Sequence, residues 1–126
     1  MGRKDVKSKM VYTTYFAKIK TLPKNIQPIS IALWPPRGWV GISYPKLAPT
    51  KSILLQYKQN PSQKIYAERY RKEVLDKLDP QEVVRELKEL AGGQDVALVC
   101  FERSGQFCHR NLVRTWLAPW EPCAQW

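Results

Sequence analysis

Three apolar runs along the chain predict three β-strands. Residues 10–16 (MVYTTYF) are rich in β-branched and aromatic side chains, whereas residues 28–34 (PISIALW) and 95–101 (DVALVCF) are almost continuously apolar. Continuous apolar runs of this length are typical of strands that are buried on both faces, as in a parallel sheet. Outside these runs the pattern changes to helical spacing or to loops rich in proline and glycine.

Helical patterns occupy much of the remaining chain. Asp79-Pro80 is a strong start signal, because Asp caps the free N–H groups of a helix and Pro suits its first position. Gly92-Gly93 then ends the apolar stripe that follows. Four helices are expected, over residues 51–58, 61–78 and 80–91 and before Pro119, with one further helical turn near 17–22.

The order of these elements predicts an α/β fold. Strands that alternate with helices are typical of a mostly parallel sheet with helices on its faces, and we expect a small, Rossmann-like three-layer arrangement. Residues 10–126 form the predicted single domain, after a flexible basic tail over 1–9, with a long loop over 35–49 and an irregular tail over 119–126. Because ligands of such sheets bind beyond the carboxyl ends of the strands, the loops after the three strands should converge on a site.

The charge balance adds an anionic partner to this expectation. The chain of 126 residues has 21 Lys and Arg against 11 Asp and Glu, a net charge of +10. Such a surplus attracts polyanions and nucleotides, although a basic tail also serves solubility alone. A content of 44% hydrophobic residues is typical of a globular domain and excludes a disordered chain. We expect a nucleotide, a nucleic acid or another anionic ligand.

Neither a membrane span nor a secretory leader is expected. No stretch approaches the ~20 apolar residues of a spanning helix, and residues 1–9 are charged and lack an apolar core. The three cysteines, Cys100, Cys108 and Cys123, are an odd number, which favours free thiols in a chain that is not secreted. Together these features predict a cytoplasmic protein.

Chemically active side chains are concentrated in residues 100–110 (CFERSGQFCHR). This segment holds two of the three cysteines, the single histidine, one glutamate and two arginines, between a buried strand and the last helix. A helix start favours an anion and also the thiolate of a nearby cysteine. The candidate catalytic residues are therefore Glu102 and Cys108. The candidate ligand-binding residues are Arg103, His109, Arg110, Cys100, Tyr12, Thr13 and Tyr44.

Four interpretations of this segment remain open. The first is a nucleophilic thiolate at Cys108 or Cys100, and the second is a metal site formed by the cysteines and His109. We expect no metal, because zinc ligands usually come in closely spaced pairs and adjacent side chains on a helix point about 100° apart. The third is an anion site built from the arginines and the helix start. The fourth is structural, with buried cysteines that only pack and an ion pair of Glu102 with Arg110.

The combination of motifs resembles a known family. The segments YTTYF, SIALWPP, YPKLAP and VALVCFERSGQFCHRNLV, with a tyrosine-bearing helix, resemble the bacterial, archaeal and phage family named domain of unknown function 488. The Cys-x-Glu and Cys-His-Arg signature of that family is matched by Cys100, Glu102, Cys108, His109 and Arg110. Many members carry a Gly-His pair where this chain has Thr13-Thr14-Tyr15, so it resembles a divergent branch. The resemblance implies a compact α/β fold with a site at the cysteine loop.

Three function hypotheses follow from the sequence. The leading one is binding of a nucleotide, nucleic acid or other anion, held by Arg103 and Arg110, with Glu102 as an acid, base or hydrogen-bond acceptor. The second is a thiol-dependent enzyme that uses Cys108 or Cys100. The third is a small protein–protein interaction module that uses its tryptophan-rich ends. The sequence assigns no cofactor and no reaction.

Overall fold

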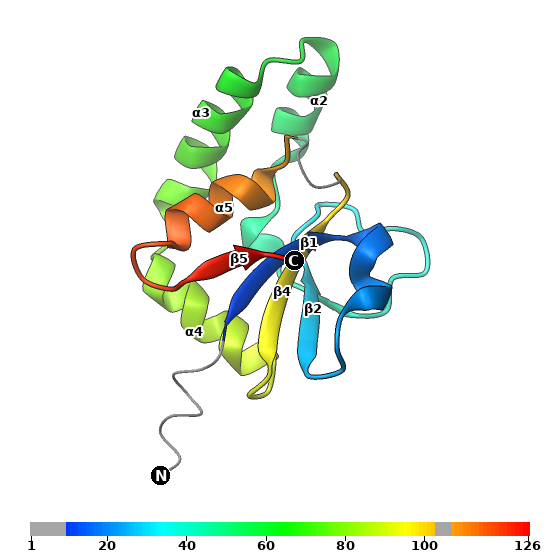
Figure 1. Cartoon of the computed structure of the whole chain (residues 1–126). Coiled ribbons are helices and arrows are strands. Elements are labelled where there is room, and N and C mark those ends of the chain that lie inside the picture. Colours follow the sequence, from blue (N-terminus) through cyan, green and yellow to red (C-terminus); the bar gives the residue numbers. More distant parts are fainter. Residues whose placement is uncertain (1–9, 103–106) are drawn as a thin grey trace.

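The computed structural model describes residues 10–102 and 107–126 and confirms the predicted α/β class (Figure 1). One sheet of parallel strands has the order β3-β2-β4-β1-β5. Helices accompany the sheet and complete a small three-layer arrangement. The strands are β1 (Val11–Tyr15), β2 (Ile26–Ser30), β3 (Ile42–Ser43), β4 (Asp95–Cys100) and β5 (Cys123–Gln125). The basic tail expected over residues 1–9 lies outside the described part of the chain.

Three of the four α-helices in the described residues begin at a residue whose side chain caps them. The carboxylate of Asp79 accepts a hydrogen bond from the Gln81 N–H, as its position before Pro80 predicts. The helix expected over 61–78 is shorter at both ends. It begins at Gln63 after the N-cap Ser62, and its regular part ends at Glu73, where a 3-10 turn follows. The helices are α2 (Lys51–Gln59), α3 (Gln63–Glu73), α4 (Pro80–Leu90) and α5 (His109–Leu117), with 3-10 helices over Phe16–Thr21, Pro45–Leu47 and Leu75–Lys77. Among the described residues, no helix combines the length and the apolar character that a membrane crossing needs.

Strand β4 lies at the centre of the sheet, between β1 and β2. Its residues from Val96 to Cys100 are buried, which confirms the prediction of a strand covered on both faces. The register places Cys100 beside Tyr15 and Val99 beside Ser30. The carboxyl ends of the three central strands therefore meet at one edge of the sheet, where β4 delivers Cys100.

Two short edge strands were not predicted. The tail after residue 119 was expected to be irregular, and this is wrong, because Cys123–Gln125 forms β5 and pairs with the start of β1. The Trp126 N–H extends this pairing to the Thr13 carbonyl at 2.9 Å. The short strand β3 lies within the loop expected over 35–49 and pairs with the end of β2. Strands of two or three residues are too short to show a periodic pattern, so they cannot be predicted from hydrophobic periodicity.

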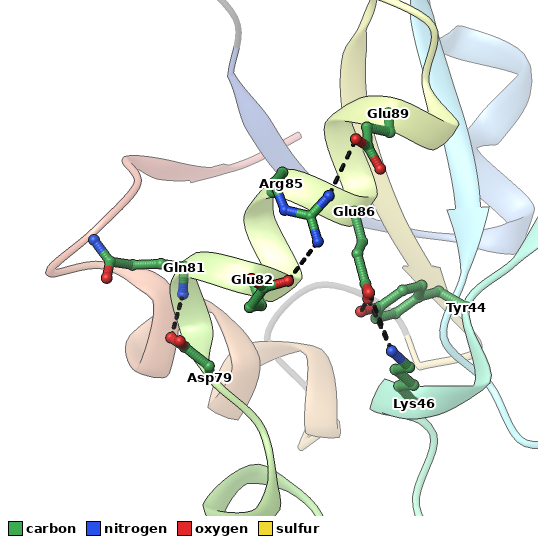
Figure 2. A network of polar contacts seen from close by, with 8 residues as sticks. All are labelled: Tyr44, Lys46, Asp79, Gln81, Glu82, Arg85, Glu86 and Glu89. Atoms are coloured by element: carbon green, nitrogen blue, oxygen red, sulfur yellow. Dashed lines mark hydrogen bonds and ion pairs between the residues drawn. The ribbon is translucent and has the colours of Figure 1, made fainter.

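A network of polar side chains joins the segment after β3 to helix α4 (Figure 2). The Tyr44 hydroxyl donates a hydrogen bond to the Glu86 carboxylate, and the Lys46 ammonium lies 3.1 Å from the same group. The Tyr44 bond and then the Lys46 bond hold the pKa of Glu86 below its ordinary value. Arg85 forms further ion pairs with Glu82 and Glu89 along the helix. The side chain of Tyr44 is therefore hydrogen-bonded to α4.

A cluster of aromatic rings packs α2 and α3 against the start of α5. The Tyr66 ring lies edge-on to Phe107, with centroids 5.0 Å apart, and the Tyr70 ring lies edge-on to His109 at 5.4 Å. Tyr57 completes the cluster by stacking on Phe107. Tyr70 is fully buried, and its hydroxyl donates a hydrogen bond of 2.5 Å to the Leu47 carbonyl. This cluster therefore fixes the position of the residues that open α5.

Replacing Tyr70 by Phe should destabilise the fold without changing its shape. The substitution removes only a hydroxyl, and it leaves the Leu47 carbonyl buried without its partner. Leaving a buried acceptor unsatisfied costs about 1–3 kcal/mol, so the free energy of unfolding in urea should fall by that amount. Tyr57→Phe is the matched control, because the half-buried Tyr57 contributes ring contacts to the same cluster and should change stability by less than about 0.5 kcal/mol. Equal losses in the two variants would contradict the assignment.

Candidate functional site

Two cysteines meet at the carboxyl end of the central strand. Cys100 is the last residue of β4, and Cys108 is the N-cap residue of α5. The structure joins them by a disulfide bond, and Cys123 remains a free cysteine. The expectation of free thiols is therefore wrong for Cys100 and Cys108. Both are almost completely buried, at 1% and 3% exposure.

The side chain of His109 lies beside the cysteine pair. The two sulfur atoms and a ring nitrogen of His109 all lie within 4.8 Å of one another, and the Cys108 Sγ is 3.8 Å from His109 Nδ1. The expected divergence of Cys108 and His109 is not observed. The two side chains can approach because the backbone of Cys108 is extended (φ −156°, ψ 146°) and not helical. The 100° angle between successive side chains of a helix therefore does not apply to this pair.

One hydrogen bond fixes the protonation of the His109 ring. Nε2 lies 2.7 Å from the Ile31 carbonyl oxygen, which only accepts, so Nε2 carries the proton. In the neutral ring Nδ1 then has a free lone pair, and this atom is the one beside Cys108. Burial lowers the pKa of His109 to about 4. The Ile31 hydrogen bond opposes this shift, and the charge of Arg110 adds to it. His109 is therefore neutral at neutral pH.

Arg110 is a buried cation with an unusual partner. It is 1% exposed, and its Nη1 donates a hydrogen bond of 3.0 Å to the Cys100 Sγ. The guanidinium carbon lies 5.8 Å from the centre of the Tyr15 ring, within range of a cation–π contact. Within the described chain it forms no ion pair, and its Nε has no hydrogen-bond partner. Burial lowers the pKa of Arg110, while the charge of Glu102 opposes that shift.

A small cavity opens beside this group. Its volume is about 150 Å³, and it lies between the ends of β2 and β4, the start of α2 and the start of α5. Glu102 is exposed on its wall, and the half-exposed rings of Trp34 and Phe101 also border it. The lining residues are Ala32, Leu33, Trp34, Pro49, Leu54, Cys100, Phe101, Glu102 and His109.

The structure separates the predicted site residues into two groups. Cys100, Cys108, His109 and Arg110 lie together, with Glu102 at the cavity, whereas Arg103 lies outside the described residues. The other three candidates, Tyr12, Thr13 and Tyr44, have contacts elsewhere and do not line the cavity. Tyr12 packs on the Trp126 ring, Thr13 is buried in the β1–β5 pairing, and Tyr44 bonds to Glu86.

Three contributors to the site were not predicted. Tyr15 lies under Arg110, the Ile31 carbonyl orients His109, and Tyr70 packs against the His109 ring. The spacing of Tyr66 and Tyr70, four residues apart on a helix, was a signal for one buried face. A backbone carbonyl such as that of Ile31 leaves no trace in the sequence, because every residue has one.

A protein-family model matches most of the chain. The matching model is DUF488-N3a, described as the active DUF488-N3 subclade, and it covers residues 11–121. No curated protein and no solved structure matches the chain. The matched range includes the whole of the cysteine site and the sheet from β1 to β4. The chain therefore belongs to the DUF488 family, as its cysteine signature predicted.

Proposed function

We propose that the chain is a thiol-dependent enzyme in which Cys100 is the reacting group. The observation that carries this proposal is the hydrogen bond from the buried Arg110 guanidinium to the Cys100 sulfur. A buried cation is costly unless a partner compensates its charge. A thiolate at Cys100 supplies that charge, and the thiolate is the nucleophilic form of cysteine. The description of the matching family model as an active subclade also supports an enzyme.

Cys100 fits the role of nucleophile better than Cys108. Cys100 lines the cavity and accepts the Arg110 hydrogen bond, whereas Cys108 is not part of the cavity wall. In the dithiol state, Cys100 attacks the electrophilic centre of a substrate, and the leaving group departs with a proton. Glu102 is exposed on the cavity wall, where its carboxylate can take the Cys100 proton and pass it to the leaving group. In the described structure Cys100 is joined to Cys108 by a disulfide, which reduction must open before Cys100 can react.

The size of the cavity limits what the site takes. A volume of about 150 Å³ is smaller than the roughly 300–1,000 Å³ of pockets that enclose a drug-sized ligand. Only the reacting end of a substrate therefore enters, and the half-exposed Trp34 and Phe101 rings offer an apolar surface to the rest. The net charge of +10 favours a substrate that is anionic.

Alkylation of the reduced protein by iodoacetamide tests the proposed nucleophile. Peptide mass spectrometry should find Cys100 modified faster than Cys123, because burial and Glu121 raise the pKa of Cys123 to about 11. Arg110→Met should slow modification of Cys100 about tenfold, the effect of losing ~1.5 kcal/mol from a hydrogen bond to a charged group. Arg110→Lys should restore part of the rate.

The control for this experiment is Arg114→Met, one turn further along α5, which should leave the Cys100 rate unchanged. The proposal fails if Cys100 in the wild-type chain reacts no faster than Cys123. This comparison needs no variant, so it holds even where an Arg110 variant does not fold.

A second candidate function is binding of single-stranded nucleic acid over the cavity. The observation in its favour is that Arg37 and Lys51 are exposed on the segments that carry the lining residues Trp34 and Pro49. The half-exposed Trp34 ring can stack on a base, and the cations can contact phosphates. A cavity of about 150 Å³ is too small to enclose a whole nucleotide, so the strand would lie across its mouth.

Salt dependence distinguishes this candidate from simple solubility. Fluorescence anisotropy with a labelled oligonucleotide should show a logarithm of affinity that falls linearly with the logarithm of salt concentration. The double variant Arg37→Gln, Lys51→Gln should reduce that slope by about 1.4, since each lost phosphate contact removes ~0.7 for a single strand. The control double variant Lys72→Gln, Lys77→Gln removes the same charge from the exposed end of α3 and should leave the slope unchanged. Equal changes in both would show a non-specific effect of net charge.

A further inference from the structure

We infer that the reduced chain binds a zinc ion through Cys100, Cys108 and His109. This metal site goes beyond the proposed thiol chemistry, because it uses both sulfurs and the ring nitrogen as ligands. Thiolate and imidazole are the donors that zinc prefers, whereas Mg²⁺ and Ca²⁺ prefer oxygen. The inference depends on the geometry of these three side chains.

The donor atoms already have nearly the spacing of zinc ligands. Zinc lies about 2.3 Å from sulfur and about 2.0 Å from nitrogen in tetrahedral sites, so its donors are roughly 3.5–3.8 Å apart. The Cys108 Sγ lies 3.8 Å from His109 Nδ1, and all three donor atoms lie within 4.8 Å of one another. Reduction of the disulfide lets the two sulfurs separate to a similar distance. Only side-chain rotations are then needed to surround an ion.

The backbone spacing of the two cysteines supports this interpretation. Their Cα atoms are 7.6 Å apart, which exceeds the ~4.4–6.8 Å usual for cysteines joined by a disulfide. Two thiolates that share a metal ion hold their sulfurs farther apart than a covalent bond does, so they suit a wider backbone. The end of β4 and the start of α5 thus have a separation that fits an ion between them.

The neighbours of the donors also suit a metal site. His109 donates its Nε2 proton to the Ile31 carbonyl, the arrangement by which zinc-bound histidines are usually oriented, and this leaves Nδ1 free to bind. Arg110 donates to the Cys100 sulfur, so the thiolate has a hydrogen-bond partner as well as a metal. Cys100 and His109 both line the cavity, which leaves room for water as a fourth ligand. Three protein ligands with one open position are typical of catalytic rather than structural zinc.

With zinc binding, the cysteine pair would have three mutually exclusive states: the disulfide, the free thiols and the zinc-bound thiolates. The disulfide has no thiolate for the metal, and a zinc-bound Cys100 is not a free nucleophile. Metal occupancy and oxidation therefore both act on the sulfur that Arg110 contacts.

Direct metal binding tests the inference. The full chain is reduced, freed of metal, and titrated with Zn²⁺ in competition with a chromophoric chelator. We expect one equivalent to bind to the dithiol chain and none to the same chain after oxidation to the disulfide. Titration with Co²⁺ should produce a thiolate-to-cobalt charge-transfer band, which reports sulfur ligation without any variant. A reduced chain that binds neither ion, or binds cobalt without that band, would overturn the inference.

Matched cysteine variants locate the site. Cys100→Ser and Cys108→Ser should each weaken zinc binding by more than the roughly 10–100-fold that loss of an outer partner costs. Cys123→Ser removes the cysteine that lies outside the cluster and should leave affinity unchanged. Equal affinities in all three variants would place the metal elsewhere and refute the assignment.

Alkylation without metal separates this inference from the proposed enzyme. Fast modification of Cys100 in a chain that binds no zinc would refute the metal site and leave the thiol proposal standing. Zinc binding in a chain whose Cys100 reacts slowly would support the metal site and refute the thiol proposal.

Discussion

Burial of the Arg110 guanidinium is the constraint on which the site depends. Moving a cation out of water costs several kcal/mol unless it is compensated, and Arg110 also lies in the first turn of α5, where the helix dipole disfavours positive charge. The described structure compensates it with the Cys100 sulfur and the face of the Tyr15 ring, which come from the ends of two neighbouring strands. The parallel register of β1 and β4 is what places these two groups side by side. A charged residue whose burial and position in the helix are both unfavourable is typical of a functional site, where local stability is lowered.

Much of this arrangement follows from patterns visible in the sequence. The apolar run of β4 predicted a strand buried on both faces, and such a strand must have neighbours on each side, as it has in β1 and β2. Because parallel strands end at one edge, the polar segment after β4 had to lie where the other loops converge. The concentration of Cys100, Cys108, His109 and Arg110 was therefore predictable as a group. Caps such as Asp79 were predictable because their hydrogen bonds are local.

The sequence could not predict contacts that depend on the backbone conformation of a single residue or on pairing at the edge of the sheet between segments far apart in the chain. Cys108 and His109 are adjacent, and helical spacing directs them apart, but Cys108 is extended as the N-cap and its sulfur lies near the His109 ring. Strand β5 has three residues, so its pairing with β1 depends on the sheet edge being open and not on any apolar pattern. Tyr44, which lies in the loop expected over 35–49, was predicted as a candidate ligand-binding residue. Its hydroxyl instead bonds to Glu86, an interaction between residues 42 positions apart that no local pattern encodes.

The two cysteines of the site are chemically different because their neighbours differ. Arg110 donates a charged hydrogen bond to Cys100, whereas Cys108 lies beside the unprotonated nitrogen of a neutral imidazole. The first contact stabilises negative charge on sulfur, and the second offers a lone pair that can accept a hydrogen bond from the Cys108 thiol or bind the same metal ion. Residues 109 and 110 are consecutive, yet the first turn of α5 directs one side chain to each sulfur. The same turn holds the observed disulfide, and it would also hold the nucleophile and the zinc site that we propose. In this proposal the redox and metal environment selects among the states, while the core around β4 and the aromatic cluster pack against the residues that carry the sulfurs.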